Sequence, residues 1–158
     1  MDSKRELLRH TVATVAYRAR KPLAGAPPDF GQFRPGATSR RAGEILAHAG
    51  DLFDWALSMA AGRAAWKDST PLPWEEEAAR FYAAVARFDE FLASDHPLAV
   101  SQEKLFQGPI ADALTHLGQI SMLRRMAGSP VRGENFAKAD IASGRVGADQ
   151  AAPRVEFD

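Results

Sequence analysis

The sequence predicts an all-α protein, a four-helix bundle followed by a C-terminal extension that packs on it. Apolar residues recur at helical spacing in four segments, each roughly 16 to 23 residues long. No segment alternates apolar and polar residues convincingly enough to predict a strand. The connections have lengths found in helical bundles. We therefore expect a single domain over residues 1–158, with the bundle over residues 3–128 and the extension over residues 129–158.

The first helix is expected from about residue 3 to residue 23. Ser3 and Glu6 have the spacing of a capping box at its start. Apolar residues then follow at helical spacing: Leu8, Val12, Val15, Ala19 and Leu23. His10 lies on the opposite side, where a partly solvated histidine is more common than a metal ligand. The next segment, residues 24–36, contains three of the ten prolines and is expected to be a loop.

The second helix is expected to begin after a cap at Thr38 or Ser39 and to continue to about Gly62. His48 lies near the middle of its main apolar stripe. The stripe consists of Ile45, His48, Leu52, Trp55, Ala56 and Met59. Asp51 follows about one turn later at the edge of this face, where its carboxylate either orients the imidazole or faces solvent.

The third helix is expected to begin near Pro71 and Pro73 and to end near Ala93. Proline suits the first turn of a helix, and the glutamates at positions 75–77 lie near the positive end of the helix dipole. Its apolar stripe consists of Trp74, Phe81, Val85, Phe88 and Leu92. Because helical spacing explains these residues without a ligand, we expect them to form core.

The fourth helix is expected over Pro109–Gly128 and carries the strongest chemical signal. Asp112 and His116 are one turn apart, at positions i and i+4. Three apolar residues continue the same face: Ile120, Leu123 and Met126. We therefore expect the carboxylate and the imidazole to be buried. Because unpaired ionisable groups are costly in a core, these side chains need each other, a third partner or a metal ion.

The C-terminal extension offers four apolar anchors and one short helical segment near residues 135–143. The anchors are Phe136, Ile141, Val146 and Phe157. They predict an ordered extension packed on the bundle; the alternative is a flexible tail.

The second and fourth helices each carry a second apolar stripe. The stripes are Leu46, Phe53 and Leu57 on the second helix, and Ile110, Leu114 and Leu117 on the fourth. A helix that is apolar on two sides is buried on two sides, either under the C-terminal extension or against another subunit. From this pattern we predict a homodimer.

Composition argues against several functional classes. Twenty basic residues balance twenty acidic ones, so no net positive field favours nucleic acid or an anionic membrane. The absence of cysteine excludes disulfides, thiolate ligands and a cysteine nucleophile. The first ten residues lack the apolar core of a secretory signal, and no run reaches the roughly 18 apolar residues of a membrane helix. We expect a cytoplasmic protein. The run GRVG is too short to predict a phosphate loop.

If the second and fourth helices face each other, His48 meets Asp112 and His116, and three nitrogen and oxygen ligands converge. Two imidazoles and one carboxylate suit Zn²⁺, Ni²⁺, Fe²⁺ or Mn²⁺, with positions left open for water or substrate. Gln119, one turn beyond His116, is placed to hydrogen-bond a ligand or a bound water. The alternative is a structural His–Asp pair with a core histidine nearby.

Two segments resemble a known family. EILAHAGDLFDWALSM in the second helix and DALTHLGQISMLRRMAGSP in the last are similar to the DinB/YfiT-like superfamily of bacterial four-helix bundles, described as metal-dependent enzymes. The resemblance covers residues 4–130. It implies that His48 and His116 are ligands and that Gln119 takes the place of the family's glutamine. Asp112 departs from the family's HxxxH pattern, because it stands where the first histidine would be; a carboxylate ligand would alter metal preference or affinity.

The resemblance implies a metal-dependent enzyme, whose single divalent ion activates water or a low-molecular-weight thiol for attack on a small substrate. A hydrolase or a thiol S-transferase fits this description. No catalytic acid or base is assigned, although Asp51, Gln119 and Glu134 are candidates near the mouth of the site. The alternative is a non-catalytic dimeric bundle with a vestigial metal site and a stress-related or regulatory role.

Overall fold

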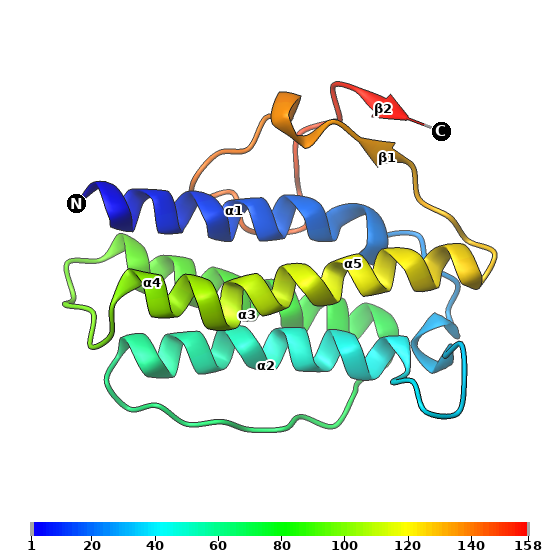
Figure 1. Cartoon of the computed structure of the whole chain (residues 1–158), viewed down its shortest axis with the longest axis horizontal. Coiled ribbons are helices and arrows are strands. Elements are labelled where there is room, and N and C mark those ends of the chain that lie inside the picture. Colours follow the sequence, from blue (N-terminus) through cyan, green and yellow to red (C-terminus); the bar gives the residue numbers. More distant parts are fainter. Residues whose placement is uncertain (1, 158) are drawn as a thin grey trace.

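The computed structural model describes residues 2–157, and four long helices form its main body (Figure 1). The long helices are α1 (Ser3–Leu23), α2 (Ala42–Ala60), α3 (Trp74–Ala93) and α5 (Ala111–Met126). The short elements are η1 (Phe30–Gln32), α4 (Gln102–Leu105), the π-helical turn η2 (Phe106–Ile110), η3 (Phe136–Lys138), and an antiparallel pair of two-residue strands, β1 (Gly133–Glu134) and β2 (Glu156–Phe157). The prediction of an all-α four-helix bundle is confirmed.

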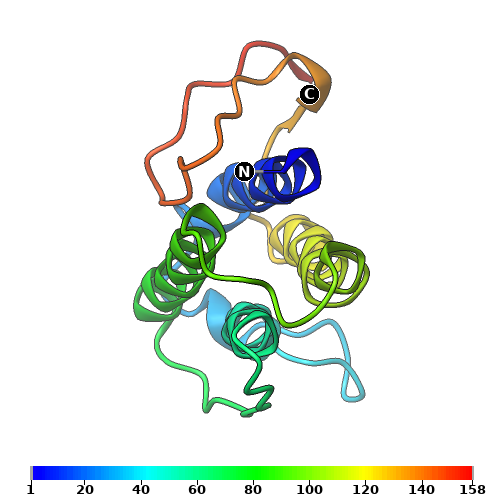
Figure 2. The same ribbon diagram turned by 90° about the vertical axis from the view of Figure 1, so that its left-hand side faces the viewer.

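The four long helices form a square in which α1 and α2 occupy opposite corners (Figure 2). Each of these two helices packs against both α3 and α5. The connection over residues 24–41 therefore crosses the bundle diagonally, whereas the connection over residues 61–73 joins neighbours by running back along α2 (Figure 1). Within residues 2–157, no helix combines the length and apolar character needed to cross a membrane.

This arrangement explains why α2 and α5 are apolar on two sides. Phe53 of α2 contacts Phe81 and Phe88 of α3, with ring centroids 5.8 and 6.1 Å apart. Ile110 and Leu117, from the second stripe of the last helix, are also buried within the chain. The two stripes therefore need no second subunit to cover them, because each helix has two neighbours in its own bundle. The homodimer stays a prediction.

Two buried arginines satisfy carbonyl groups at helix ends. Arg5 donates to the carbonyls of Phe91 and Leu92, at 3.0 and 2.7 Å, near the end of α3. Arg124 donates to the carbonyl of Pro22, at 3.0 Å, near the end of α1. The last carbonyls of a helix have no partner within the helix, so these bonds remove a desolvation penalty and tie helices together.

Two predicted helix starts are wrong. The second helix begins at Ala42, not after Thr38 or Ser39, because its cap comes from Glu44, whose carboxylate accepts from the Arg41 amide at 2.6 Å. The last helical segment begins at Gln102, well before Pro109, and is continuous into α5. The π-helical turn η2 accommodates the missing N–H of proline, so Pro109 does not start a new helix.

The C-terminal extension packs on the outer face of α1, as predicted (Figure 1). Tyr17 is buried beneath it and donates to Glu134 at 2.7 Å. Lys21 pairs with the same carboxylate at 3.3 Å, and Val146 joins the core. Phe157 is not an anchor, since it is 52% exposed on the short β ladder. The predicted helix near residues 135–143 is only the single turn η3.

The Tyr17–Glu134 hydrogen bond should contribute measurably to stability. Burial and Glu134 raise the pKa of Tyr17 to about 12, so the phenol stays protonated and donates. We expect Tyr17→Phe to lower the free energy of unfolding by about 2 kcal/mol, because a buried carboxylate loses a donor. Urea denaturation measures this change.

The matched control is Tyr82→Phe, since the Tyr82 hydroxyl has no hydrogen-bond partner among residues 2–157. We expect this control to stay within about 0.5 kcal/mol of the wild type. Equal losses in the two variants would contradict a stabilising role for the bond.

Candidate metal site

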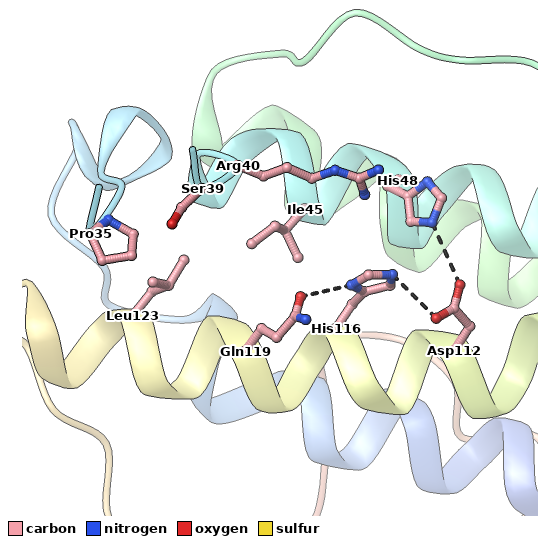
Figure 3. Close-up of a pocket in the computed structure, with 9 residues that line it drawn as sticks. All are labelled: Pro35, Ser39, Arg40, Ile45, His48, Asp112, His116, Gln119 and Leu123. Carbon is pink, nitrogen blue, oxygen red and sulfur yellow. Dashed lines mark hydrogen bonds and ion pairs between the residues drawn. The ribbon is translucent and has the colours of Figure 1, made fainter. Parts of the chain in front are cut away.

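Helices α2 and α5 bring three ligand-type side chains together at one side of the bundle (Figure 3). His48 of α2 points toward Asp112 and His116 of α5. The His48 Nε2 atom lies 3.6 Å from Asp112 Oδ2, and the His116 Nε2 atom lies 3.4 Å from Asp112 Oδ1. One ligand atom from each residue lies within 4.8 Å of the other two. The predicted convergence of these residues is confirmed.

The group lies at the edge of the bundle, and the prediction that it is buried is wrong. The side chains of His48 and His116 are 22% and 12% exposed, and that of Asp112 is 46% exposed. Met126, expected on the same buried face, is also exposed. The reason is that the α2–α5 seam faces outward here, and the flanking loops border the seam without covering it. The ligands are therefore accessible to solvent.

Gln119 fixes the orientation of the His116 ring. Its Oε1 atom lies 2.8 Å from His116 Nδ1 (Figure 3). Because an amide oxygen only accepts, Nδ1 carries the proton, and in the neutral ring Nε2 then presents a lone pair toward Asp112. The carboxylate of Asp112 is also an acceptor. Two acceptors that face each other attract a proton or a cation into the space between them.

His48 is held toward its neutral form. Burial is the main cause of its lowered pKa, and the nearby His116 and Arg40 lower the pKa further. Asp112 acts in the opposite direction, because its carboxylate favours the protonated imidazole. A neutral imidazole is the form that binds a metal ion. The groups around His48 therefore favour the neutral imidazole, which is the form that can bind a metal ion.

The donor set and spacing fit a divalent cation. Four ligands about 2.1 Å from a tetrahedral Zn²⁺ lie about 3.4 Å from one another. The two carboxylate–imidazole distances, 3.6 Å to Oδ2 and 3.4 Å to Oδ1, are close to that value, and the three ligand atoms all lie within 4.8 Å of one another. They are also long for direct hydrogen bonds, so the carboxylate does not satisfy either imidazole on its own. Two nitrogen donors and one carboxylate suit Zn²⁺ and neighbouring transition metals.

A pocket of about 590 Å³ extends from the three ligands along the α2–α5 seam. Its polar end contains His48, Asp112 and His116, its other end is lined by Pro35 and Leu123, and Ile45 lies between them (Figure 3). Arg40, Ser39 and Gln119 also line it. The volume is typical of sites for small organic ligands.

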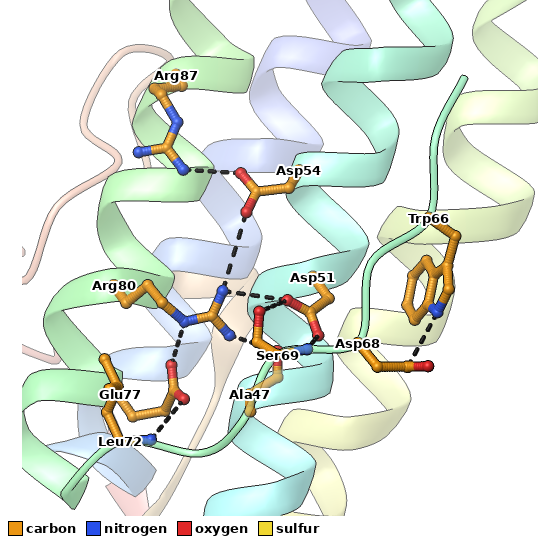
Figure 4. Close-up of polar contacts among 10 residues, drawn as sticks. All are labelled: Ala47, Asp51, Asp54, Trp66, Asp68, Ser69, Leu72, Glu77, Arg80 and Arg87. Carbon is orange, nitrogen blue, oxygen red and sulfur yellow. Dashed lines mark hydrogen bonds and ion pairs between the residues drawn. The ribbon is translucent and has the colours of Figure 1, made fainter. Parts of the chain in front are cut away.

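Two residues predicted near the mouth of the site have other partners. Asp51 neither orients His48 nor faces solvent: it is buried and accepts from the Ser69 hydroxyl at 2.6 Å and from Arg80 at 3.1 Å (Figure 4). Glu134 lies on the far side of α1, bound to Tyr17. Neither carboxylate is available to the metal site.

The Asp51 network fixes the loop over residues 61–73 against α2 (Figure 4). Asp51 also accepts from the Ser69 backbone amide, at 2.8 Å. Arg80 bridges Asp51 to Glu77, whose side chain is fully buried. The loop in turn carries Trp66, whose ring centroid lies 5.3 Å from that of His48. The network thus positions an aromatic wall beside a candidate ligand.

Sequence reasoning missed Trp66, Arg40 and Arg80. Glu77 and Arg80 have the i, i+3 spacing of a helical ion pair, a signal that was available. Trp66 and Arg40 lie in loops between helices. The spacing of apolar residues in a loop does not predict where its side chains lie in the fold.

Comparison with known proteins gave no match to a family model, a curated protein or a solved structure. Support for the site therefore comes from the geometry of its residues.

Removal of the Asp51 carboxylate should be strongly destabilising. We expect Asp51→Ala to lower the free energy of unfolding by about 3 kcal/mol, because Arg80 and the Ser69 amide lose a buried acceptor. Chemical denaturation tests this. Asp54→Ala on the same helix is the control: its pair with Arg87 is exposed and its contact with Arg80 is long, at 3.9 Å, so the loss should stay below about 1 kcal/mol. A similar loss in both variants would argue against the network.

The imidazole of His48 should titrate below the ordinary value of about 6.5 in metal-free protein. Because the folded-state pKa is lowered, the neutral ring stabilises the fold above pH 6.5, and this contribution is lost as the pH falls through the folded pKa. Asp112→Asn should lower the pKa further, since it removes a carboxylate that favours the charged ring. NMR titration measures both values, and a wild-type value above 6.5 would contradict the expectation.

Proposed function

We propose that this protein binds one divalent cation through His48, Asp112 and His116 and is a metal-dependent enzyme acting on a small molecule. The observation that carries the proposal is the convergence of two imidazoles and a carboxylate at the polar end of a pocket. When bound, the cation supplies Lewis acidity, which lowers the pKa of a water molecule or of a low-molecular-weight thiol toward neutrality. A hydrolase or a thiol S-transferase is therefore the reaction class we propose.

The chain's own residues would hold and shape the site. His48 and His116 offer neutral nitrogen donors, and Asp112 offers a negative charge that partly balances the cation. Gln119 keeps the His116 lone pair directed at the site through its hydrogen bond to Nδ1. The open side of Asp112 leaves room for a substrate.

We also propose membership of the DinB/YfiT-like superfamily. Its support is the bundle architecture, one histidine from the second long helix, and a carboxylate and histidine at i, i+4 on the last long helix. Asp112 replaces the first histidine of the HxxxH pattern, and a carboxylate in that position would favour harder cations such as Mn²⁺ more than a third imidazole would. A homodimer in the cytoplasm is part of the same proposal.

Metal content tests the site directly. We expect protein purified without chelator and given Zn²⁺, followed by removal of excess, to retain about one equivalent by elemental analysis, because three ligands converge. His48→Ala and His116→Ala should each lose it, with helical circular dichroism unchanged. Isothermal titration of metal-free protein gives the affinities.

The other two histidines provide the controls. His10→Ala and His96→Ala change exposed residues outside the pocket, so both should bind Zn²⁺ as the wild type does. Gln119→Ala should weaken binding by about tenfold, because His116 loses its orienting partner. A wild type that retains no metal, or a His48→Ala variant that retains it, would favour a bundle with a vestigial site.

Catalysis is tested with two probe reactions: hydrolysis of 4-nitrophenyl acetate, and conjugation of glutathione with 1-chloro-2,4-dinitrobenzene. We expect the Zn²⁺-loaded wild type to accelerate one of them and His116→Ala to lose at least 90% of that rate, roughly the effect of removing a metal ligand. Rates equal to those of His116→Ala in both reactions would count against an enzyme of either class.

A further inference from the structure

Arg40 places a positively charged guanidinium group beside the candidate metal site. Its side chain extends along the pocket from the start of α2 toward His48 (Figure 3). Within residues 2–157, the Arg40 guanidinium has no hydrogen bond and no carboxylate within ion-pair distance.

The nearby carboxylates already have partners. Three acids share a shallow depression with Arg40 on the other side of His48: Glu44, Asp51 and Asp68. Glu44 accepts from the Arg41 amide, Asp51 is bound by Arg80, and Asp68 accepts from the Trp66 indole. On the pocket side, Asp112 is the one acidic residue among positions 2–157 that lines the cavity. A divalent cation together with Arg40 would therefore leave the pocket with excess positive charge.

The pocket is also amphipathic along its length. Arg40, Ile45 and Gln119 lie between the ligand end and the apolar end formed by Pro35 and Leu123 (Figure 3). A guanidinium binds carboxylate or phosphate oxygens through a planar pair of donors. The apolar end offers contact area to a hydrocarbon group of the same molecule.

We propose that the pocket binds a small organic acid, a carboxylate or a phosphate monoester. Its anionic group is held by Arg40 next to the three ligands, and its apolar part contacts Ile45 and Leu123. This inference rests on the proposed function, for which it names a substrate class. Arg40 is the residue that selects the anion.

The test uses four probes that share one hydrocarbon chain: hexanoate, hexyl phosphate, hexanol and hexylammonium. Each is titrated calorimetrically into full-length wild type, metal-free and loaded with one equivalent of Zn²⁺. We expect an anionic probe to bind more tightly than hexanol and hexylammonium in both forms. Arg40→Gln should weaken that binding about tenfold, and Arg40→Lys should retain part of it. The tighter of the two anions identifies the headgroup.

Arg63→Gln is the matched control, because it makes the same charge change beyond the other end of α2 and outside the pocket lining. It should bind the anion as the wild type does. Equal affinities for hexanoate and hexanol, or an Arg40→Gln variant that binds like wild type, would overturn the inference. Zn²⁺ titration of wild type and Arg40→Gln separates the two proposals: failure of the wild type to bind Zn²⁺ overturns the metal site, whereas Arg40-dependent binding in metal-free protein supports the anion pocket.

Discussion

The close approach of α2 and α5 is the constraint on which the candidate site depends. The His48 and His116 rings meet edge to face across this seam, with centroids 4.8 Å apart. Ile45 of α2 and Ile120 of α5 are both buried members of the apolar core that packs these helices together. A slip of one helical turn, about 5.4 Å, would separate the three ligands beyond the reach of one cation. The apolar core therefore sets the geometry of a polar site that lies outside it.

Helix α2 carries two polar side chains, His48 and Asp51, that lie about one turn apart and point to different sides of the helix. His48 faces α5 and the pocket, whereas Asp51 faces α3 and is committed to Arg80 and Ser69. The second set of contacts holds the returning loop, which brings Trp66 against the outer side of His48. A buried ion-pair network on one side of the helix thus positions an aromatic ring beside a candidate ligand on the other side.

The partial exposure of the ligands has a functional consequence. A fully buried His–Asp pair would serve structure alone, since no cation or substrate could reach it without local opening. Here the three side chains form the end of an open pocket, and the His116 ring is oriented by a hydrogen bond to Gln119 of the same helix. A cation or a small molecule could therefore reach these side chains without rearrangement of the bundle.

The sequence by itself determined the four helical segments, the apolar stripes and the pairing of Asp112 with His116, because these follow from the 3.6-residue period of one helix. It also identified His48 as the partner, on the condition that the second and last helices are neighbours. Only the tertiary structure decided that condition, the exposure of Asp112, and the roles of Trp66, Arg40 and Asp51. Helical periodicity fixes which residues share a face of one helix. Which helix packs against that face depends on the path of the long loops, and the sequence of a loop contains no periodic pattern that predicts its path.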